Sequence, residues 1–223
     1  DDQLLKRCLR ENKVKRLDVL VLSHFDFDHV GGIEGLAGVE IGKVLVSGFD
    51  DQRRAVDQVT NFLRERGLEP QTGYRGMSDK FGQGFWEIIS PSASASEASN
   101  ANDASLVMLI TLPKTQLLAL GDLGGDFQDN LIQLGLEGRL DQQLPLILKA
   151  SHHGSADQSE RFHRLVDPEI SVISVGENSY GHPDARFISL LRSTGSKVLR
   201  TDRQGMIGIQ SVPELRVFVT GRL

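Results

Sequence analysis

Two histidines and two aspartates fall within six consecutive positions of the chain, directly after an apolar run. The apolar run spans residues 17–22, and the polar residues are His24, Asp26, Asp28 and His29. Alternate side chains of an extended chain share a face, so His24, Asp26 and Asp28 point the same way, and a following turn returns His29. Imidazole and carboxylate groups bind zinc, iron and manganese, and charges gathered at the end of a buried strand are costly without a cation. The segment therefore predicts a site for two adjacent divalent metal ions.

Two later apolar segments also end in side chains that bind metals. Residues 117–120 lead into Asp122, and residues 146–149 lead into the neighbouring pair His152 and His153. An aspartate in a glycine-containing turn is common, so Asp122 alone is weak evidence. Adjacent histidines at a strand end are more informative, because the chain has only six histidines. We therefore expect three strands to deliver ligands at their ends.

Two other histidines are harder to assign. His182 lies in a Gly-His-Pro segment after an expected strand at 170–175. Either a structural role or a catalytic, substrate-facing role fits it. His163 lies in a helical segment and has no partner in the sequence, so we expect it at the surface.

The elements that must hold these residues alternate between helices and strands. Apolar periodicity predicts helices over residues 4–11, 52–66, 125–133, 159–166 and 185–193. It predicts strands over residues 17–22, 43–46, 86–89, 105–112, 116–120, 145–149, 170–175, 197–200, 206–209 and 215–219. The serine- and alanine-rich segment 92–102 has no periodicity, and we expect a mobile loop there near the site. The pattern favours the α/β class.

Composition limits the domain organisation. The chain has 223 residues, of which 39% are apolar, enough to bury the core of one domain. Because the possible ligands come from both halves of the sequence, we expect residues 1–223 to form a single domain. No run of about 18 apolar residues is present, so we expect this piece to be soluble. The lone Cys8 excludes an internal disulfide.

Taken together, these motifs resemble those of the metallo-β-lactamase superfamily, in particular the soluble C-terminal domain of ComEC-type DNA-internalisation (competence) proteins. The motifs are His-x-Asp-x-Asp-His at 24–29, Leu-Gly-Asp at 120–122, Ser-His-His-Gly-Ser at 151–155, Gly-His-Pro at 181–183 and Thr-Asp-Arg-Gln-Gly at 201–205. The first motif indicates the superfamily, and the later ones indicate the branch. The resemblance runs over about residues 17–209. It implies an αββα sandwich, in which two mixed β-sheets lie face to face with helices outside and metals at one rim.

The resemblance also implies a ligand set for two divalent ions, Mn²⁺ or Zn²⁺. The assignment gives His24 and Asp26 to one ion, Asp28, His29 and His153 to the other, and Asp122 to both as a bridge. His153 precedes glycine, as the corresponding ligand of the superfamily does, although the choice between His152 and His153 is close. Two such ions lower the pKa of water toward about 7 and so permit in-line attack on phosphorus.

The expected catalytic residues are Asp28, His152 and His182. His152 or His182 would contact the substrate. His182 would donate a proton to the leaving oxygen or hold a phosphate oxygen.

Two departures from the superfamily pattern carry consequences. Asp26 stands where the commonest motif has a second histidine, and residues 100–106 stand where a mid-chain histidine ligand is usual. The first pocket is therefore rich in oxygen ligands, which shifts the expected metal away from zinc alone and toward manganese or a mixed pair of ions. The chain also opens on Asp1 without the two N-terminal strands of the family. We expect a fragment of a larger, membrane-anchored protein, with a sheet edge that can pair with another copy or with the missing segment.

Three functions remain open from the sequence. The leading hypothesis is a metal-dependent DNA nuclease that degrades the non-transforming strand during DNA uptake, on the extracellular side of the cell membrane and beside the channel domain of the same protein. The alternatives are a small-molecule phosphodiesterase or phosphorylcholine-esterase-like hydrolase, and a non-catalytic DNA-guiding module. A net charge of −5 weakens the DNA hypotheses. Bound metal ions offset the site aspartates, however, and tethering beside a channel raises the effective concentration of DNA.

Overall fold

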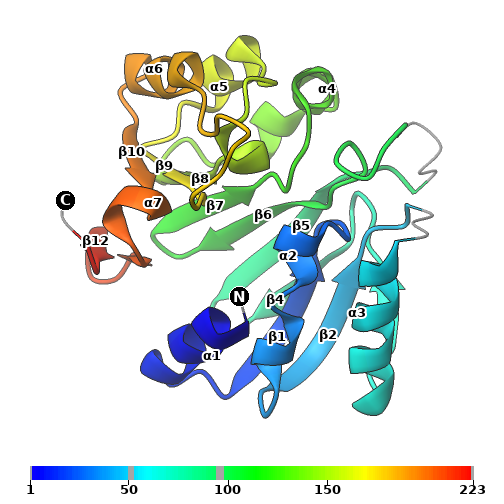
Figure 1. Cartoon of the computed structure of the whole chain (residues 1–223). Coiled ribbons are helices and arrows are strands. Elements are labelled where there is room, and N and C mark those ends of the chain that lie inside the picture. The colour runs from blue at the N-terminus through cyan, green and yellow to red at the C-terminus, as the bar shows by residue number, and fades with distance from the viewer. Residues whose placement is uncertain (1, 50–52, 94–97, 222–223) are drawn as a thin grey trace.

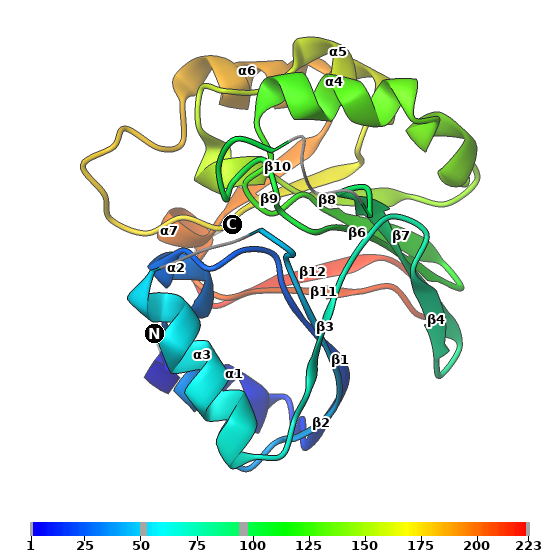
Figure 2. The same ribbon diagram turned by 90° about the vertical axis from the view of Figure 1, so that its right-hand side faces the viewer.

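Two β-sheets face each other between two layers of helices (Figure 2). The computed structural model describes residues 2–49, 53–93 and 98–221 (Figure 1). The smaller sheet consists of β1 (Arg16–Leu22), β2 (Glu40–Val46) and β3 (Pro70–Thr72), all parallel. Its helices are α1 (Asp2–Glu11), α2 (Phe27–Val30), the 3-10 helix η1 (Ile33–Leu36) and α3 (Arg54–Glu65). The strands are parallel because both connections cross over through helices.

The larger sheet has seven strands in the order β10-β9-β8-β7-β6-β5-β4. The strands are β4 (Ser78–Phe81), β5 (Gly84–Ser90), β6 (Val107–Leu112), β7 (Thr115–Ala119), β8 (Leu146–Lys149), β9 (Ile170–Ile173) and β10 (Lys197–Arg200). Strands β4 to β7 pair antiparallel and β7 to β10 pair parallel.

Helices cover the outer face of the larger sheet (Figure 2). They are α4 (Gly125–Gln133), α5 (Glu160–Val166) and α6 (Ala185–Ser193). The shorter helices η3 (Leu136–Arg139), η4 (Ser151–Gly154) and α7 (Thr201–Gln204) lie in the connections.

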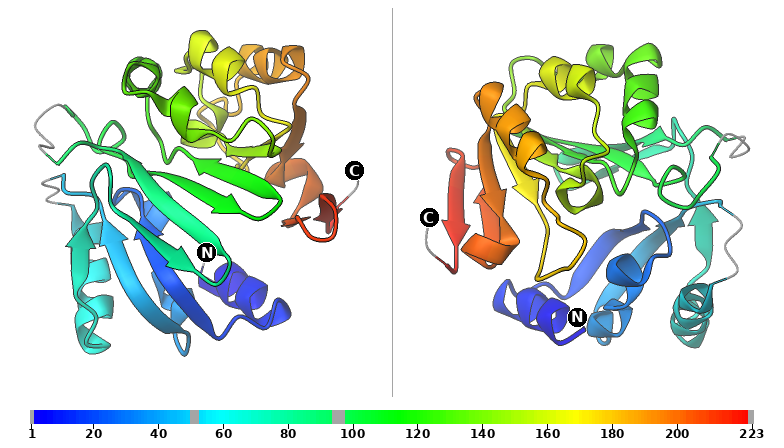
Figure 3. Two further views of the ribbon diagram at one scale, coloured as in Figure 1. Left: turned by 180° about the vertical axis from the view of Figure 1, so that it is seen from behind. Right: turned by 45° about the horizontal axis from the view of Figure 1, so that its top comes forward.

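A two-stranded hairpin lies at the edge of the molecule beside α7 and β10 (Figures 1 and 3). It consists of β11 (Ile207–Gln210) and β12 (Arg216–Val219), paired antiparallel. Ile207 and Val217 of the hairpin pack in a cluster with Ile147 of β8. Because alternate residues of a strand face opposite ways, and Leu148 packs in the core with α5 and α6, the hairpin covers the other face of the sheet.

Separate apolar layers hold the two sheets and their helices together. Leu148 and Phe162 belong to the core between the larger sheet and its helices. Phe62 of α3 packs in the core beneath the smaller sheet. Leu45 and Trp86 bring the two sheets together. The rims of both sheets are therefore fixed relative to each other, which a site spanning them requires.

The structure confirms the expected α/β sandwich and most of its elements. The expected helix at 52–66 is helical from Arg54, and its first residue, Gln52, lies outside the described residues. In the part of the chain described, the smaller sheet is purely parallel rather than mixed, because helices form both connections between its strands. The strands β3 and β4 were not expected, because they are short, largely exposed and without a clear apolar alternation.

Two further sequence expectations meet the structure only in part. Residues 94–97 of the segment expected to be a mobile loop lie outside the described residues. Within the ranges described, no helix has the length and apolar character needed to cross a membrane.

Candidate metal centre

The loops that follow β1, β7, β8 and β9 carry the predicted site residues. All four loops leave the carboxyl ends of parallel strands, where α/β sheets commonly bind ligands. They carry, in chain order, His24, Asp26, Asp28 and His29, then Asp122, then His152 and His153, and finally His182. Every predicted site residue thus lies at one rim of the sandwich.

His24, His29 and Asp122 form one group of possible ligands, and this group is buried. Its ligand atoms lie within 4.8 Å of one another. The side chains of His24 and Asp122 are 1% and 3% exposed, and His24 Nε2 lies 3.9 Å from Asp122 Oδ2. His29 Nε2 lies 3.1 Å from Asp122 Oδ1. Among the described residues, His24 Nε2 and Asp122 Oδ1 are both buried without an assigned hydrogen-bond partner. Buried polar atoms are rarely left unpaired, and these two fit the ligands of a cation.

Asp28, His29 and His153 form a second group, which faces solvent. Their ligand atoms also lie within 4.8 Å of one another. Asp28 Oδ2 lies 2.9 Å from His153 Nε2, and the Asp28 side chain is 60% exposed. His29 Nε2 lies 3.3 Å from His153 Nε2, so two ring nitrogens face the same point. His29 belongs to both groups, and the residues therefore fit a pair of neighbouring divalent ions.

Burial and neighbouring charges give the two groups different ionisation. Burial, with a smaller contribution from His29, lowers the pKa of His24 to about 4. The hydrogen bond to Asp28 raises the pKa of His153, and the same bond lowers the pKa of Asp28 to about 2. Burial opposes ionisation of Asp122, but the neighbouring His29 outweighs it and keeps the pKa of this carboxyl below its usual value. The buried group thus pairs a neutral imidazole with a carboxylate, whereas in the exposed group the contact between Asp28 and His153 favours the charged form of each.

Two serines orient the buried group. Ser23 Oγ lies 3.1 Å from His24 Nδ1, and Ser105 Oγ lies 3.3 Å from the same nitrogen. Ser105 Oγ also accepts a hydrogen bond of 3.0 Å from the backbone N–H of Asp122. Gly121 has φ +58°, and a Cβ there would lie 2.7 Å from Ser105 Cβ, so this turn requires glycine. Contacts to Nδ1 of this kind leave Nε2 available to a metal.

The turn η4 holds His152 and His153 in left-handed backbone conformations, with φ 45° and 52°. Non-glycine residues rarely adopt this conformation, and where they do the site is often functional. His153 Nδ1 lies 2.7 Å from the carbonyl oxygen of Ser174, which turns Nε2 toward Asp28. His152 Nε2 lies 3.9 Å from Asp122 Oδ2, yet His152 is in neither ligand group. This arrangement supports His153 over His152 as the ligand, and the choice stays a prediction.

Asp26 lies beside the buried group without belonging to it. Its Oδ1 is 3.8 Å from His24 Nε2, and the same oxygen is ion-paired with the guanidinium of Arg53. The sequence assigned His24 and Asp26 to one ion, whereas the structure groups His24 with Asp122 and His29. Asp26 as a ligand stays a prediction, and binding would require its carboxylate to leave Arg53.

A row of rings leads from the metal centre to the surface. The His152 and His182 ring centroids lie 5.4 Å apart, and those of His182 and Tyr180 lie 6.1 Å apart. Burial, followed by the charge of His152, lowers the pKa of His182. Tyr180 is 83% exposed. His182 therefore lies outside both ligand groups but next to them.

The expectation that His163 is at the surface was wrong. Its side chain is 0% exposed, and burial lowers its pKa to about 4. Its Nε2 lies 3.1 Å from Gln158 Oε1, and Gln158 Nε2 donates to the Ser151 carbonyl and to Ser155 Oγ around η4. The ring also packs 4.9 Å from that of Phe187 in α6. The sequence offered no partner for His163, but tertiary packing turns this face of α5 inward and supplies Gln158 and Phe187.

Lys149 is a second residue whose burial beside the metal centre was not predicted from the sequence. Its Nζ is buried without a hydrogen-bond partner, and Asp122 and Asp28 are the charges that act on it. Burial lowers the pKa of this ammonium. Its only sequence signal was its place at the end of β8, directly before the histidine turn.

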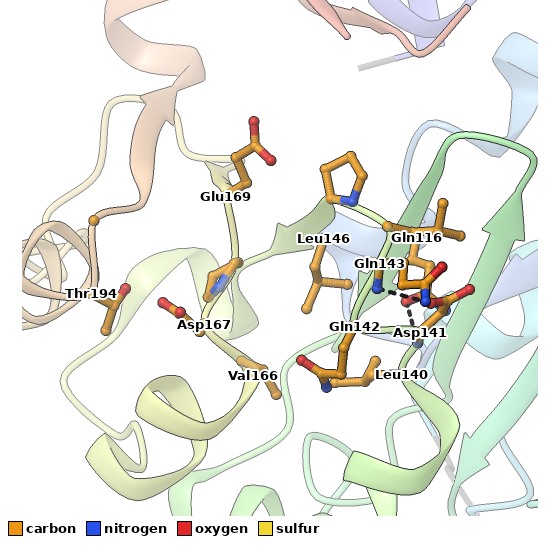
Figure 4. Close-up of a pocket in the computed structure, with 14 residues that line it drawn as sticks. Gln116, Leu140, Asp141, Gln142, Gln143, Leu146, Val166, Asp167, Glu169 and Thr194 are labelled. Atoms are coloured by element: carbon orange, nitrogen blue, oxygen red, sulfur yellow. Dashed lines mark hydrogen bonds between the residues drawn. The ribbon is translucent and has the colours of Figure 1, made fainter. Parts of the chain in front are cut away.

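Figure 4 shows a cavity of about 460 Å³, and none of the residues that line it belongs to the metal centre. Gln116 near the start of β7, Leu146 at the start of β8 and Glu169 just before β9 line it. It is therefore at the amino ends of strands whose carboxyl ends carry the ligands. No histidine or cysteine lines it, and we assign it no chemistry.

The chain is similar to known proteins in both sequence and fold. The sequence profile of the metallo-beta-lactamase superfamily matches residues 2–75. ComE operon protein 3 of Bacillus subtilis (strain 168) is 29% identical over 210 residues, covering 92% of this chain and 26% of that protein. Competence protein ComA of Neisseria gonorrhoeae is 30% identical over 202 residues, covering 87% of this chain and 25% of that protein. The chain thus spans about a quarter of the length of these curated relatives.

A solved structure shows the same fold at low sequence identity. Tm1679, described as a metal-dependent hydrolase of the beta-lactamase superfamily, aligns with a TM-score of 0.54 and 11% identity. The alignment covers 88% of this chain and 81% of that one. With the two ligand groups at the rim of the sandwich, these similarities show the metallo-β-lactamase fold, and the sequence resembles the metallo-beta-lactamase superfamily over residues 2–75 and competence proteins of the ComEC type over most of its length.

Proposed function

We propose that the protein is a nuclease that hydrolyses phosphodiester bonds of DNA with two divalent metal ions. The observation that carries the proposal is the pair of ligand groups that share His29. Paired ions of this kind are common in phosphatases and nucleases, because together they stabilise the attacking and leaving oxygens. The names of the curated relatives, which are competence proteins, support DNA as the substrate.

The residues around the ligand groups fit this chemistry. Divalent ions held there would generate the nucleophile from water and neutralise charge on the scissile phosphate. His182 and His152 lie beside the groups, and we propose that they contact the substrate phosphate. Because burial lowers the pKa of His182, its imidazole is neutral near pH 7 and offers one N–H to a phosphate oxygen. Asp28 orients His153 and completes the catalytic set.

Two exposed aromatic rings near the site favour a nucleic acid over a small phosphodiester. Phe27, between Asp26 and Asp28, is 67% exposed, and Tyr180 is 83% exposed. Exposed aromatic rings stack on nucleic-acid bases at a gain of about 1–3 kcal/mol per base. A small phosphodiester such as a phosphorylcholine ester would not need them.

The wider setting is also a proposal. We propose that the domain acts on the extracellular side of the cell membrane, on the strand that is not taken up during transformation. We further propose that it lies beside the channel domain of the same polypeptide. The length of the curated relatives, about four times that of this chain, supports the presence of such a partner in those proteins. The three aspartates of the site favour Mn²⁺ over Zn²⁺.

Cleavage assays with three substrates test the proposal. The protein is incubated with Mn²⁺ and either labelled DNA, bis(p-nitrophenyl) phosphate or p-nitrophenylphosphorylcholine. We expect DNA cleavage that is abolished by EDTA and lowered by at least about 10³-fold in Asp122→Asn. Asp57→Asn, an equal charge change on the exposed face of α3, should behave as wild type.

The other outcomes identify the alternatives. Hydrolysis of either small ester without cleavage of DNA would indicate a small-molecule hydrolase. DNA binding without cleavage, together with no bound ion under saturating Mn²⁺, would indicate a DNA-guiding module. Undiminished DNA cleavage by Asp122→Asn would contradict the two-metal mechanism.

A further inference from the structure

A cleft lined by three arginines opens beside the metal centre. It has a volume of about 320 Å³ and lies between α6 and the β10–α7 connection. Arg192 comes from the end of α6, Arg200 from the end of β10 and Arg203 from α7. No carboxylate lines it. Three guanidinium groups therefore meet in one hollow of a chain whose net charge is −5.

One of the three arginines is ion-paired, and the other two form no salt bridge with a described residue. Arg200 forms hydrogen bonds of 3.0 and 2.6 Å to the carboxylate of Asp202. Arg192 and Arg203 are exposed and form no salt bridge with any residue in the described ranges. Guanidinium groups bind phosphate through paired hydrogen bonds, and a concave site of one charge sign concentrates the opposite charge. The cleft therefore fits a phosphate group.

The cleft and the metal centre share a wall. Pro183 lines the cleft and directly follows His182. The next residue, Asp184, donates its backbone N–H to the Gly154 carbonyl at 2.7 Å, which joins this wall to the histidine turn η4. A Cβ at Gly154 would lie 2.7 Å from Pro183 Cβ, so the two segments are in close contact. The cleft and the histidine turn therefore contact the same short segment of chain, Pro183 and Asp184.

We propose that this cleft binds a backbone phosphate of the nucleic-acid strand whose neighbouring phosphodiester lies at the metal centre. The inference rests on the proposed nuclease function and adds to it a binding site outside the metal ligands. Arg192 and Arg203 bind and position the strand, and they take no part in bond cleavage. Arg200, held by Asp202, forms the fixed side of the cleft.

The double variant Arg192→Gln/Arg203→Gln tests the cleft. Both side chains are exposed, so the fold should be unchanged. We measure binding of a fluorescent single-stranded oligonucleotide in Ca²⁺ by anisotropy over a range of salt concentrations. We expect about tenfold weaker binding, with the slope of log K against log salt smaller by about 0.7 for the one lost phosphate contact. Turnover of bis(p-nitrophenyl) phosphate, which is too short to reach the cleft, should stay within about twofold of wild type.

A matched control removes the same charge elsewhere. Arg10→Gln/Arg64→Gln changes exposed arginines on α1 and α3, in the other half of the sandwich, and should retain oligonucleotide affinity. Equal affinities and salt slopes for the cleft variant and wild type would overturn the inference, while DNA cleavage by wild type would still support the nuclease. If wild type neither binds nor cleaves DNA, the proposed function fails and the cleft inference fails with it.

Discussion

The two ligand groups of the metal centre share His29 but differ in burial and in charge. The buried group has a neutral His24 and a carboxylate, Asp122, each with an atom that no hydrogen bond satisfies. In the exposed group, Asp28 and His153 satisfy each other through an ion pair of 2.9 Å. A cation entering the buried group gains unpaired ligands, whereas one entering the exposed group must first break the contact between Asp28 and His153. We therefore expect the buried group to bind its ion first and more tightly.

The largest expected effect comes from substituting one histidine ligand in each group and comparing metal content and DNA cleavage. His24→Gln should lose the tightly held ion and lower DNA cleavage by about 10³-fold, because one ion alone cannot stabilise both the attacking and the leaving oxygen. His153→Gln should keep that first ion and lose only the second. Metal content after gel filtration, measured by mass spectrometry, checks this beside the cleavage rate. Retention of the first ion by His24→Gln and its loss from His153→Gln would reverse the order of binding.

Acid should act on the two groups in opposite directions in the metal-free protein. The pKa of His24 is lowered to about 4 in the folded state, so its contribution to stability is full above about 6.5 and is lost as the pH falls toward 4. That loss is about 3 kcal/mol. The pKa of His153 is raised, so its contribution is full below 6.5 and is lost as the pH rises through the folded value.

Urea unfolding of metal-free variants between pH 4 and pH 8 measures this difference. His24→Gln should lose less stability than wild type on acidification, and His153→Gln should lose more. The comparison uses the pH dependence within each variant, so a constant cost of either substitution cancels. Identical pH profiles for the two variants would show that burial does not distinguish the groups.

A smaller effect is expected from the serine that supports the buried group. Ser105→Ala removes the contact to His24 Nδ1 and the acceptor of the Asp122 N–H. Loss of such a support typically costs about 10–100-fold in metal affinity or activity. Ser193→Ala, on the exposed side of α6, is the control. Calorimetric titration with Mn²⁺ checks the prediction, and an unchanged affinity would assign Ser105 to folding alone.

The smallest effect concerns Asp26 and its partner Arg53. Arg53→Gln releases the Asp26 carboxylate and should tighten Mn²⁺ binding at the buried group by about fivefold, the scale of a partly exposed ion pair. Asp26→Asn should weaken binding if Asp26 moves onto the ion, as the sequence predicts. If neither substitution changes the affinity, Asp26 is not a ligand and its role is to hold Arg53.

The residues of the site could be predicted from the sequence because each follows the end of an apolar strand. Their places after β1, β7 and β8 predicted that His29, Asp122 and His153 lie at one rim, whereas the expected alternation of His24, Asp26 and Asp28 fails because residues 27–30 form the helix α2. Ser105 and Arg53 could not be identified in this way, because neither follows a ligand-bearing strand. Their contacts to His24 and Asp26 span 81 and 27 residues of chain.

The sequence by itself determined which candidate ligands of divalent ions follow which strands, and which superfamily their motifs resemble. These properties are local, since they depend on residue type, strand period and turn residues. Only the tertiary structure decided that the two histidines of the first motif belong to one buried group, that His29 is shared, and that His163 is buried. Burial, pKa shifts and pairing depend on what other segments pack against a side chain, and those neighbours are brought close only by folding. The first motif predicted a metal site, and the packing around it buries one ligand group and leaves the other exposed to solvent.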